Sequence, residues 1–343
     1  MSTLKVDTIT KADGTGSLSV PAESGTVVTT ASPSLGRRNL IINGDHQVQQ
    51  RGTSFSTSGS DRFTSDRWAL NPIGASPCSA SIQFDSTLQK NTLKVTKETS
   101  TGDIQIVNKI EGFKQFHNKQ FTLSYYVRAS TSRDLYIGSG FMSTSEFTTI
   151  ETTTVPATTQ WQKFTRTFSS TDMSSYTEDG SSWLRLEFRL SGSSGGTVAA
   201  GEWIEFTDVQ IELGSVATPF EHRSYGEELA LCERYYQVHG FNGYVTTLQA
   251  YNSSGTYGAV LRIDNMRTTP SVGATGLWRC GQPNSTWTPA SGGTFSGLSV
   301  IGYNGTAVVI SGGPTVGGMS GLTAGNASML GGINGTITAD AEL

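Results

Sequence analysis

The sequence predicts an all-β protein, and three features of its composition lead to this prediction. Serine, threonine and glycine make up 129 of the 343 residues, so turn formers and residues that suit strands dominate. Charged residues are only 15% of the chain, against a usual share of about 25%. Hydrophobic residues still reach 35%, with 9% aromatic, which is too many for a disordered chain that would need a high net charge.

We divide the chain into four parts by composition and pattern. Residues 1–36 form an N-terminal segment, residues 37–222 a β-sandwich, residues 223–239 a linking helix, and residues 240–343 a C-terminal β-rich domain. The order of a sandwich, one short helix and a second β part fits an all-β architecture rather than an α/β one.

The N-terminal segment contains two short predicted strands. One carries Leu4 and Val6 on the same face and leads into the turn Ala12-Asp13-Gly14, and the other covers residues 25–30. Such a short segment has too few apolar side chains to close a core. We therefore expect it to dock on sister chains, on a partner protein or on the next domain.

The β-sandwich is predicted from strict alternation of apolar and polar residues. Residues 121–128 and 183–190 each place an apolar side chain at every second position, as a strand with one buried face does. In residues 203–213 the apolar positions change parity near Thr207-Asp208. This change predicts a β-bulge there, or a strand that changes neighbours.

A helix is predicted at residues 226–238, where apolar residues recur at helical spacing. Ser224 precedes it as the N-cap, and Glu227 follows three positions later, as in a capping box.

The C-terminal domain is predicted to return to strands. Asn304-Gly305 and Asn334-Gly335 lie between apolar runs and suit two-residue hairpin turns. From Thr268 onward, 76 residues contain one basic and two acidic side chains and 17 glycines. A surface this poor in charge predicts contacts with further copies of the chain.

Global properties exclude several classes of function. A net charge of −4 and a pI near 5.6 give no basic surface for nucleic acid. The sequence shows no secretory signal and no run of about 18 apolar residues, so neither secretion nor membrane insertion is expected. Cys78, Cys232 and Cys280 are expected to be free thiols of a protein made in a reducing cytosol. The spacing of the histidines and cysteines suits no zinc site, and we expect no cofactor.

Four stretches resemble tail-fibre or receptor-binding proteins of tailed bacteriophages. They are MSTLKVDTITKADGTGSLSVPAESGTVVTT, RRNLIINGDHQVQQRGTSF with DRFTSDRW, DVQIELGSVATPFEHRSYGEELALCERYYQ, and LRIDNMRTTPSV. The resemblance implies a virion protein of the phage tail, made in the host cytoplasm and assembled as a homotrimer. It further implies attachment to the tail, baseplate or an adaptor protein through residues 1–36, and a distal tip that meets host surface polysaccharide.

The middle of the chain also resembles a jelly-roll carbohydrate-binding module. The matching stretches are Asn43-Gly44-Asp45, FTLSYYVRAS at residues 121–130, Trp161-Gln162-Lys163-Phe164, and Asp208-Val209-Gln210-Ile211. The chain departs from the family at His46, where a phenylalanine is usual, which weakens the predicted opening strand. The resemblance implies a jelly-roll sandwich, and it allows a structural Ca²⁺ ion with Asp208 as a ligand.

Aromatic residues are the candidates for glycan binding, because sugar rings stack on them. Trp183 shares the outward parity of Arg185 in its predicted strand, whereas Trp161 and Trp203 are expected in the core. The candidates of the C-terminal domain stand in Gly- and Ser-rich surroundings, as exposed tip residues or in contacts between chains. They are Tyr251, Tyr257, Trp278, Trp287 and Tyr303.

We expect a binding protein rather than an enzyme. A glycosidase needs two neighbouring carboxylates, and the C-terminal domain has almost none. The acids Glu202, Glu205, Asp208 and Glu212 lie on a predicted strand and are expected on a solvated face. The alternatives are a tailspike-type polysaccharide depolymerase and a purely structural collar or baseplate component.

Overall fold

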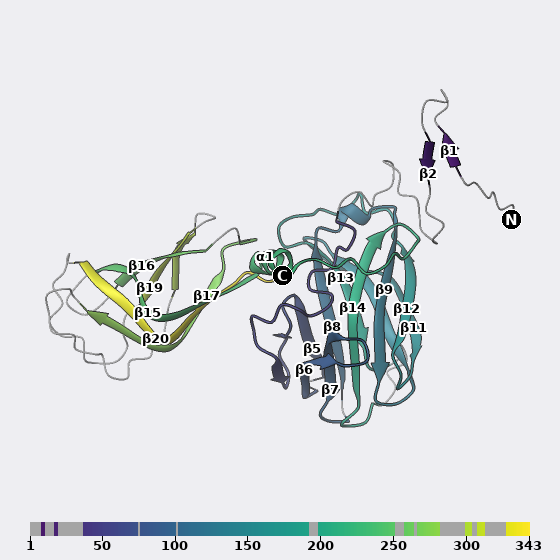
Figure 1. Cartoon of the computed structure of the whole chain (residues 1–343), viewed down its shortest axis with the longest axis horizontal. Helices are drawn as coiled ribbons and strands as arrows, with labels where there is room; N and C mark the ends of the chain where they lie inside the picture. The colour runs from purple at the N-terminus through teal and green to yellow at the C-terminus, as the bar shows by residue number, and fades with distance from the viewer. Residues whose placement is uncertain are drawn as a thin grey trace. The chain divides into compact units, whose positions relative to one another are not determined.

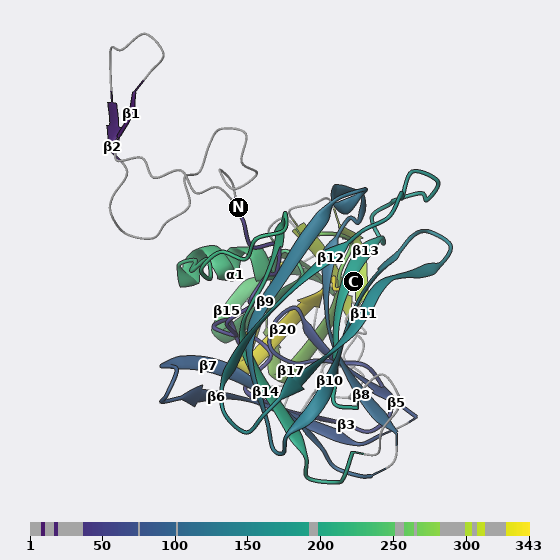
Figure 2. The ribbon, with the colours of Figure 1, turned by 90° about the vertical axis from the view of Figure 1, so that its right-hand side faces the viewer.

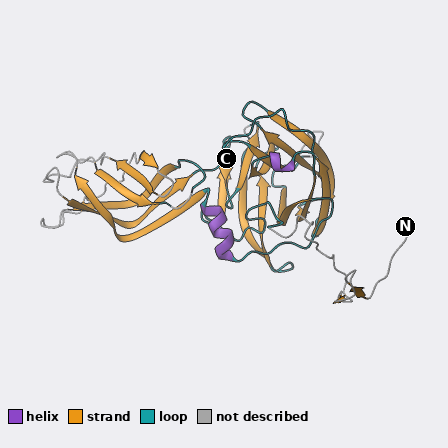
Figure 3. Cartoon of the chain, turned by 90° about the horizontal axis from the view of Figure 1, so that it is seen from above, coloured by secondary structure: helices purple, strands orange, loops and turns teal. Residues whose placement is uncertain are grey.

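Strands form nearly all the regular structure in the computed structural model, which confirms the all-β prediction (Figure 3). The structure describes residues 8–10, 17–19, 37–74, 76–100, 102–191, 198–250, 257–263, 266–281, 299–303, 307–312 and 327–343. Only the backbone is described for residues 8–10, 17–19, 241–250, 257–262, 274–281, 299–303, 307–312 and 327–335. Within the described residues, no helix has the length and apolar character needed to span a membrane.

The chain divides into two compact units, Met1–Arg38 and Asn39–Leu343. In the first unit, β1 (Thr8–Thr10) pairs with β2 (Ser17–Ser19) as an antiparallel hairpin. The strand predicted at residues 25–30 lies outside the described residues.

Two six-stranded antiparallel sheets form a sandwich at the start of the second unit (Figures 1 and 2). We call the first of them the front sheet, and its strand order is β11-β10-β13-β8-β5-β4. Its strands are β4 (Arg62–Phe63), β5 (Trp68–Ile73), β8 (Asp103–Glu111), β10 (Arg133–Met142), β11 (Phe147–Ala157) and β13 (Trp183–Arg189).

The second sheet, the back sheet, has the strand order β12-β9-β14-β7-β6-β3. Its strands are β3 (Ser54–Thr57), β6 (Cys78–Asp85), β7 (Lys90–Lys97), β9 (Gln120–Ala129), β12 (Gln162–Ser169) and β14 (Trp203–Leu213). A short 3-10 helix, η2 (Lys114–Phe116), lies between β8 and β9.

The core lies between the two sheets, as the alternation predicted. The inward side chains of β9 and β13 are all buried. The Phe188 ring of β13 stacks on Phe206 of β14 with centroids 5.2 Å apart, and Trp68 lies 5.1 Å from Phe206. These contacts join one sheet to the other through large apolar side chains, whose burial is the main source of stability.

The bulge predicted in residues 203–213 is present in β14. The register with β9 shifts between Thr207 and Gln210, and Asp208 has a φ of 52° in the left-handed region. The extra residue turns Val209 and Ile211 into the core.

The opening residues 39–50 form no strand, and asparagine side chains replace part of the missing backbone pairing. The side-chain oxygen of Asn39 accepts hydrogen bonds from the backbone of Ile41 (2.9 Å) and Ile211 (3.2 Å). The side chain of Asn43 bonds both the N–H (3.0 Å) and the carbonyl (2.9 Å) of Val48. A weakened opening strand is expected here from the sequence, and the structure has instead a polar loop that is hydrogen-bonded to β14.

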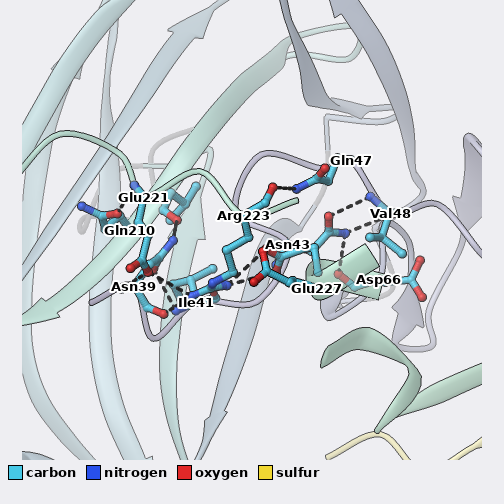
Figure 4. Close-up of polar contacts among 12 residues, drawn as sticks. Asn39, Ile41, Asn43, Gln47, Val48, Asp66, Gln210, Glu221, Arg223 and Glu227 are labelled. Atoms are coloured by element: carbon cyan, nitrogen blue, oxygen red, sulfur yellow. Dashed lines mark hydrogen bonds and ion pairs between the residues drawn. The ribbon is translucent and has the colours of Figure 1, made fainter. Parts of the chain in front are cut away.

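Arg223 ties this loop to the helix that follows the sandwich. Figure 4 shows its side chain lying between Asn39 and Asn43. It donates to the carbonyl of Ile41 (3.1 Å) and pairs with Glu228 (3.1 Å), which also accepts the N–H of Asn43 (2.5 Å). The buried pair of Arg223 and Glu228 thus holds the loop to the helix. Buried charges are costly unless they are paired and hydrogen-bonded, and the loop backbone supplies these further hydrogen bonds.

His46 occupies a fully buried aromatic position. Its ring lies 5.4 Å from Trp68 and 5.3 Å from Phe206, and Ser65 Oγ lies 3.2 Å from Nδ1. Burial lowers the pKa of His46 to about 3. The neutral imidazole therefore packs among the core aromatics as an uncharged ring.

Changing His46→Phe is expected to stabilise the chain relative to wild type by about 2 kcal/mol more at pH 5 than at pH 7. The unfolded chain takes up a proton below the usual pKa of 6.5, whereas the folded chain stays neutral down to about pH 3. Because the unfolded state binds more protons in this window, the stability of the wild type falls as the pH is lowered. Phenylalanine cannot take up a proton, so the variant does not lose this stability. Urea unfolding of both chains at the two pH values measures it, and a pH-independent difference would contradict it.

The helix α1 (Tyr225–Glu233) begins with the predicted capping box. Ser224 accepts the N–H of Glu227, and the Glu227 carboxylate accepts the N–H of Ser224. The predicted end at residue 238 is wrong, because the helix stops at Glu233 and Tyr236 begins a strand. Tertiary contacts decide this boundary, since the Tyr236 ring lies 3.5 Å from the Arg51 guanidinium carbon.

The C-terminal domain is a third six-stranded sheet, with the order β17-β20-β15-β16-β19-β18. Its strands are β15 (Tyr236–Ala250), β16 (Tyr257–Arg262), β17 (Ser271–Gly281), β18 (Ser299–Tyr303), β19 (Ala307–Gly312) and β20 (Ala327–Asp340).

Of the two Asn-Gly turns predicted in this domain, the first lies outside the described residues and the second is wrong. The strands that flank Asn304-Gly305, β18 and β19, pair antiparallel with Tyr303 opposite Val308, so the predicted hairpin pairing is present. Asn334-Gly335 instead lies inside β20, which pairs with β15 on one side and β17 on the other. Both pairings shift register there, so the glycine-rich stretch marks irregular pairing rather than a turn.

Candidate functional site

A hollow of about 280 Å³ lies on the outer face of the front sheet. Every strand of that sheet contributes to it, so the hollow crosses the sheet from the β11 edge toward the β4 edge. We call it the front hollow, and its lining residues are Asp61, Phe63, Ala69, Asn71, Val107, Lys109, Met142, Phe147, Trp183, Arg185 and Leu343.

The strand register explains why these residues meet on one face. Directly opposed residues of antiparallel strands point to the same side of the sheet. Trp183 is opposed by Met142 of β10, and Arg185 is opposed by Lys109 of β8. The alternation that buries Leu184 therefore turns Trp183 and Arg185 outward, as predicted for Trp183.

Two glycines of β10 make room for aromatic rings on this face. A Cβ atom on Gly140 would lie 2.5 Å from the Phe147 ring, and one on Gly138 would lie 2.9 Å from the Tyr136 ring. Both rings thus lie against the β10 backbone, in space that any other residue would fill. Gly140 therefore leaves room for Phe147 beside Trp183, and Gly138 leaves room for Tyr136 further along β10, opposite Arg189.

Charged side chains form a row between these rings. Glu187 is only 3% exposed and accepts hydrogen bonds from Gln105 (2.9 Å) and Arg189, while Arg185 pairs with it at 2.7 Å. The guanidinium carbons of Arg185 and Arg189 also lie 4.2 and 4.7 Å from the centroids of the two rings just described. Each arginine is therefore held by a carboxylate and an aromatic ring together.

Trp183 forms an aromatic platform with its neighbours. Its ring centroid lies 5.9 Å from that of Phe147, and the Lys109 ammonium lies 4.8 Å from the Trp183 ring. Phe147 is 37% exposed, whereas Trp183 is 9% exposed. This arrangement offers apolar ring surface beside N–H donors, which is how proteins hold flat, hydroxyl-bearing ligands.

The side chains of the other predicted site residues lie outside the described part of the structure. Tyr251 and Trp287 lie outside the described residues. Tyr257, Trp278 and Tyr303 fall in β16, β17 and β18, of which only the backbone is described.

The prediction that Trp161 and Trp203 belong to the core is wrong. Both are half-buried on the outer side of the back sheet, and Trp161 precedes β12 rather than lying in it. The Arg128 guanidinium carbon lies 4.6 Å from the Trp161 ring, and the Lys94 ammonium lies 4.5 Å from the Trp203 ring. Trp203 lies before the bulge of β14, so it keeps the outward parity of Glu205.

The expectation of solvated acids on this strand is also wrong for three of the four. Glu205, Asp208 and Glu212 are 1%, 3% and 4% exposed. Glu205 pairs with Arg128 at 2.8 Å, and the carboxylate of Glu212 accepts hydrogen bonds from Thr218. Neighbouring segments supply these partners, which the strand's own alternation does not reveal.

Asp208, the calcium ligand allowed by the resemblance, accepts a hydrogen bond from Lys90 Nζ. In the described part of the chain, no three His, Cys, Asp or Glu side chains gather as metal ligands would. A structural calcium ion at Asp208 stays a prediction.

Phe147, Lys109 and Tyr136 were missed by sequence reasoning. Lys109 belongs to a strand whose polar and apolar residues alternate imperfectly, and Phe147 stands at the start of an exposed threonine-rich strand. The one signal for Tyr136 and Phe147 is the Gly-Ser-Gly stretch between them, since glycine inside a strand marks close approach of another group.

Residues 66–181 match the family model described as "Carbohydrate binding domain", which is about a third of the chain. The matched range contains Lys109 and Phe147 and ends just before Trp183. This part of the chain is therefore similar to carbohydrate-binding domains. A search of curated proteins finds no match.

Similar solved structures include modules and a phage protein. One is described as "CBM4 structure and function", with 19% identity over 51% of this chain and 99% of that chain and a TM-score of 0.33. Another is the family 11 carbohydrate-binding module from Clostridium thermocellum in complex with a mixed-linked tetrasaccharide. It has 14% identity over 48% of this chain and 98% of that chain, with a TM-score of 0.32. A third is the enzymatically active domain of tailspike protein 4 of bacteriophage CBA120. It has 10% identity over 51% of this chain and 21% of that chain, with a TM-score of 0.33.

Proposed function

We propose that the front hollow binds a saccharide. The observation that carries the proposal is the row of aromatic rings and charged donors across the front sheet, with Phe147 exposed and Trp183 beside it. A sugar ring would place its C–H face on these rings, and its hydroxyl groups would accept hydrogen bonds from Lys109, Arg185 and Asn71. The family match over residues 66–181 supports the same function.

The hollow favours binding over hydrolysis. Asp61 is the only side-chain carboxylate among its described lining residues, whereas glycosidases use a pair of carboxylates. Glu187, on the same face, is already engaged by Arg185 and Arg189. The alternative of a depolymerase predicts new reducing ends when the chain is incubated with polysaccharide, and sustained turnover would replace our proposal.

At the level of the virion, we propose a tail-fibre or receptor-binding protein that adsorbs to host surface glycan. The resemblance of residues 1–30 and 208–237 to phage tail fibres supports this role, with residues 1–36 as the attachment segment. A homotrimer would cover the charge-poor C-terminal domain and would present three hollows, which raises avidity through effective concentration. Mass measurement in solution tests the trimer, and a stable monomer would contradict it.

The binding proposal is tested with the full chain on an array of bacterial surface oligosaccharides and delipidated lipopolysaccharides. We expect saturable binding to a subset that shares a sugar unit. Uniform absence of binding across the array would reject the proposal.

A further inference from the structure

The segment that follows β20 contributes to the front hollow. Leu343 is one of its lining residues, and the backbone oxygen of Leu343 accepts a hydrogen bond from Lys109 Nζ at 2.6 Å. Lys109 is the residue whose ammonium group lies over the Trp183 ring. The sandwich alone therefore does not complete the hollow.

Buried ion pairs hold this segment, residues 340–343, against the sandwich. The Glu342 side chain is 3% exposed and pairs with Arg67, whose side chain is 1% exposed. Arg51 pairs with Glu342 at 3.3 Å and with Asp340 at 3.0 Å. Removing one partner of a buried pair leaves a charge uncompensated, so these contacts set where the segment lies.

Arg67 connects its ion pair with Glu342 to the front hollow. Arg67 Nη2 donates to the backbone carbonyl of Lys109, while Arg67 Nη1 binds the Glu342 carboxylate. Lys109 Nζ in turn donates a hydrogen bond to the backbone oxygen of Leu343. Glu342, Arg67, Lys109 and Leu343 thus form a closed ring of contacts beside Trp183.

We propose that residues 340–343 are part of the saccharide site, as one wall of the front hollow and as the group that positions Lys109. This proposal rests on the proposed function of the hollow. Its consequence is thermodynamic: a saccharide that touches Lys109 or Leu343 binds best when the segment is docked, and it stabilises the docked segment in return. Such coupling is reciprocal, and it typically amounts to 5- to 150-fold in affinity.

The test compares Glu342→Gln with wild type in the full chain, using cellotetraose, β-1,4-galactotriose and delipidated lipopolysaccharides as probes. We expect the affinity of Glu342→Gln to fall at least about fivefold. The matched control is Glu202→Gln, which removes the pair between Glu202 and Arg133 (2.5 Å) away from the hollow and is expected to bind as wild type does.

Hydrogen exchange on the wild-type chain gives a readout that needs no variant. Adding the probe that binds is expected to slow exchange of the amides of residues 341–343, which a merely structural segment would not show. Binding by wild type with equal affinity of Glu342→Gln, or with unchanged exchange, would overturn this proposal and leave the proposed function standing. Failure of wild type to bind every probe would overturn both.

Discussion

The change Trp183→Ala is expected to lower saccharide affinity at least about 30-fold, which is the loss of about 2 kcal/mol seen for aromatic residues at the centre of a binding site. The variant should remain folded, because Trp183 lies on the outer face of the front sheet and outside the core cluster. Titration calorimetry with a saccharide from the array measures the affinity, and circular dichroism checks the fold.

Trp203→Ala is the matched control for this change. Trp203 is also an outward tryptophan of a sheet, but it belongs to the back sheet and lies under Lys94. We expect its replacement to leave the affinity unchanged. Equal losses of saccharide affinity in the two variants would show that the binding site is not the front hollow.

The change Gly44→Ala is expected to destabilise the fold by at least about 3 kcal/mol, at the upper end of overpacking costs. A Cβ atom at this position would lie 2.1 Å from the backbone oxygen of Val209 in β14. That oxygen also accepts a hydrogen bond from Asn39, and Val209 donates its N–H to the carbonyl of Gly44. The loop would have to leave β14, and the free energy of unfolding from urea titration measures the cost.

Gly226→Ala controls for the chemistry of this change. Gly226 lies in α1 and has open space where its Cβ would be. Alanine there should leave stability unchanged or raise it by about 0.5–1 kcal/mol. A similar loss in both variants would show that close approach to Val209 is not the reason for Gly44.

Local signals predicted much of the sandwich. Alternation identified β9 and β13, the parity change located the bulge at Asp208, and the Ser224–Glu227 spacing found the capping box. These features depend on residues a few positions apart, so the sequence carries them directly. The outward orientation of Trp183 followed from the same alternation.

The rest of the site depends on pairings between distant segments. Lys109 joins Trp183 because β8 pairs with β13, and Phe147 of β11 joins it across β10. Leu343 joins them because the segment after β20 packs on the sandwich. The same reason explains the buried Glu205, whose partner Arg128 lies on a neighbouring strand. Register and long-range ion pairs leave no periodic trace in one sequence.

The most direct test of saccharide binding at the front hollow is the indole N–H spectrum of the ¹⁵N-labelled chain, recorded while a saccharide from the array is added. We expect the Trp183 signal to shift in a saturable way and the signals of Trp161 and Trp203 to stay in place. Saturable shifts of Trp161, Trp203, Trp278 or Trp287 with an unmoved Trp183 signal would contradict this expectation.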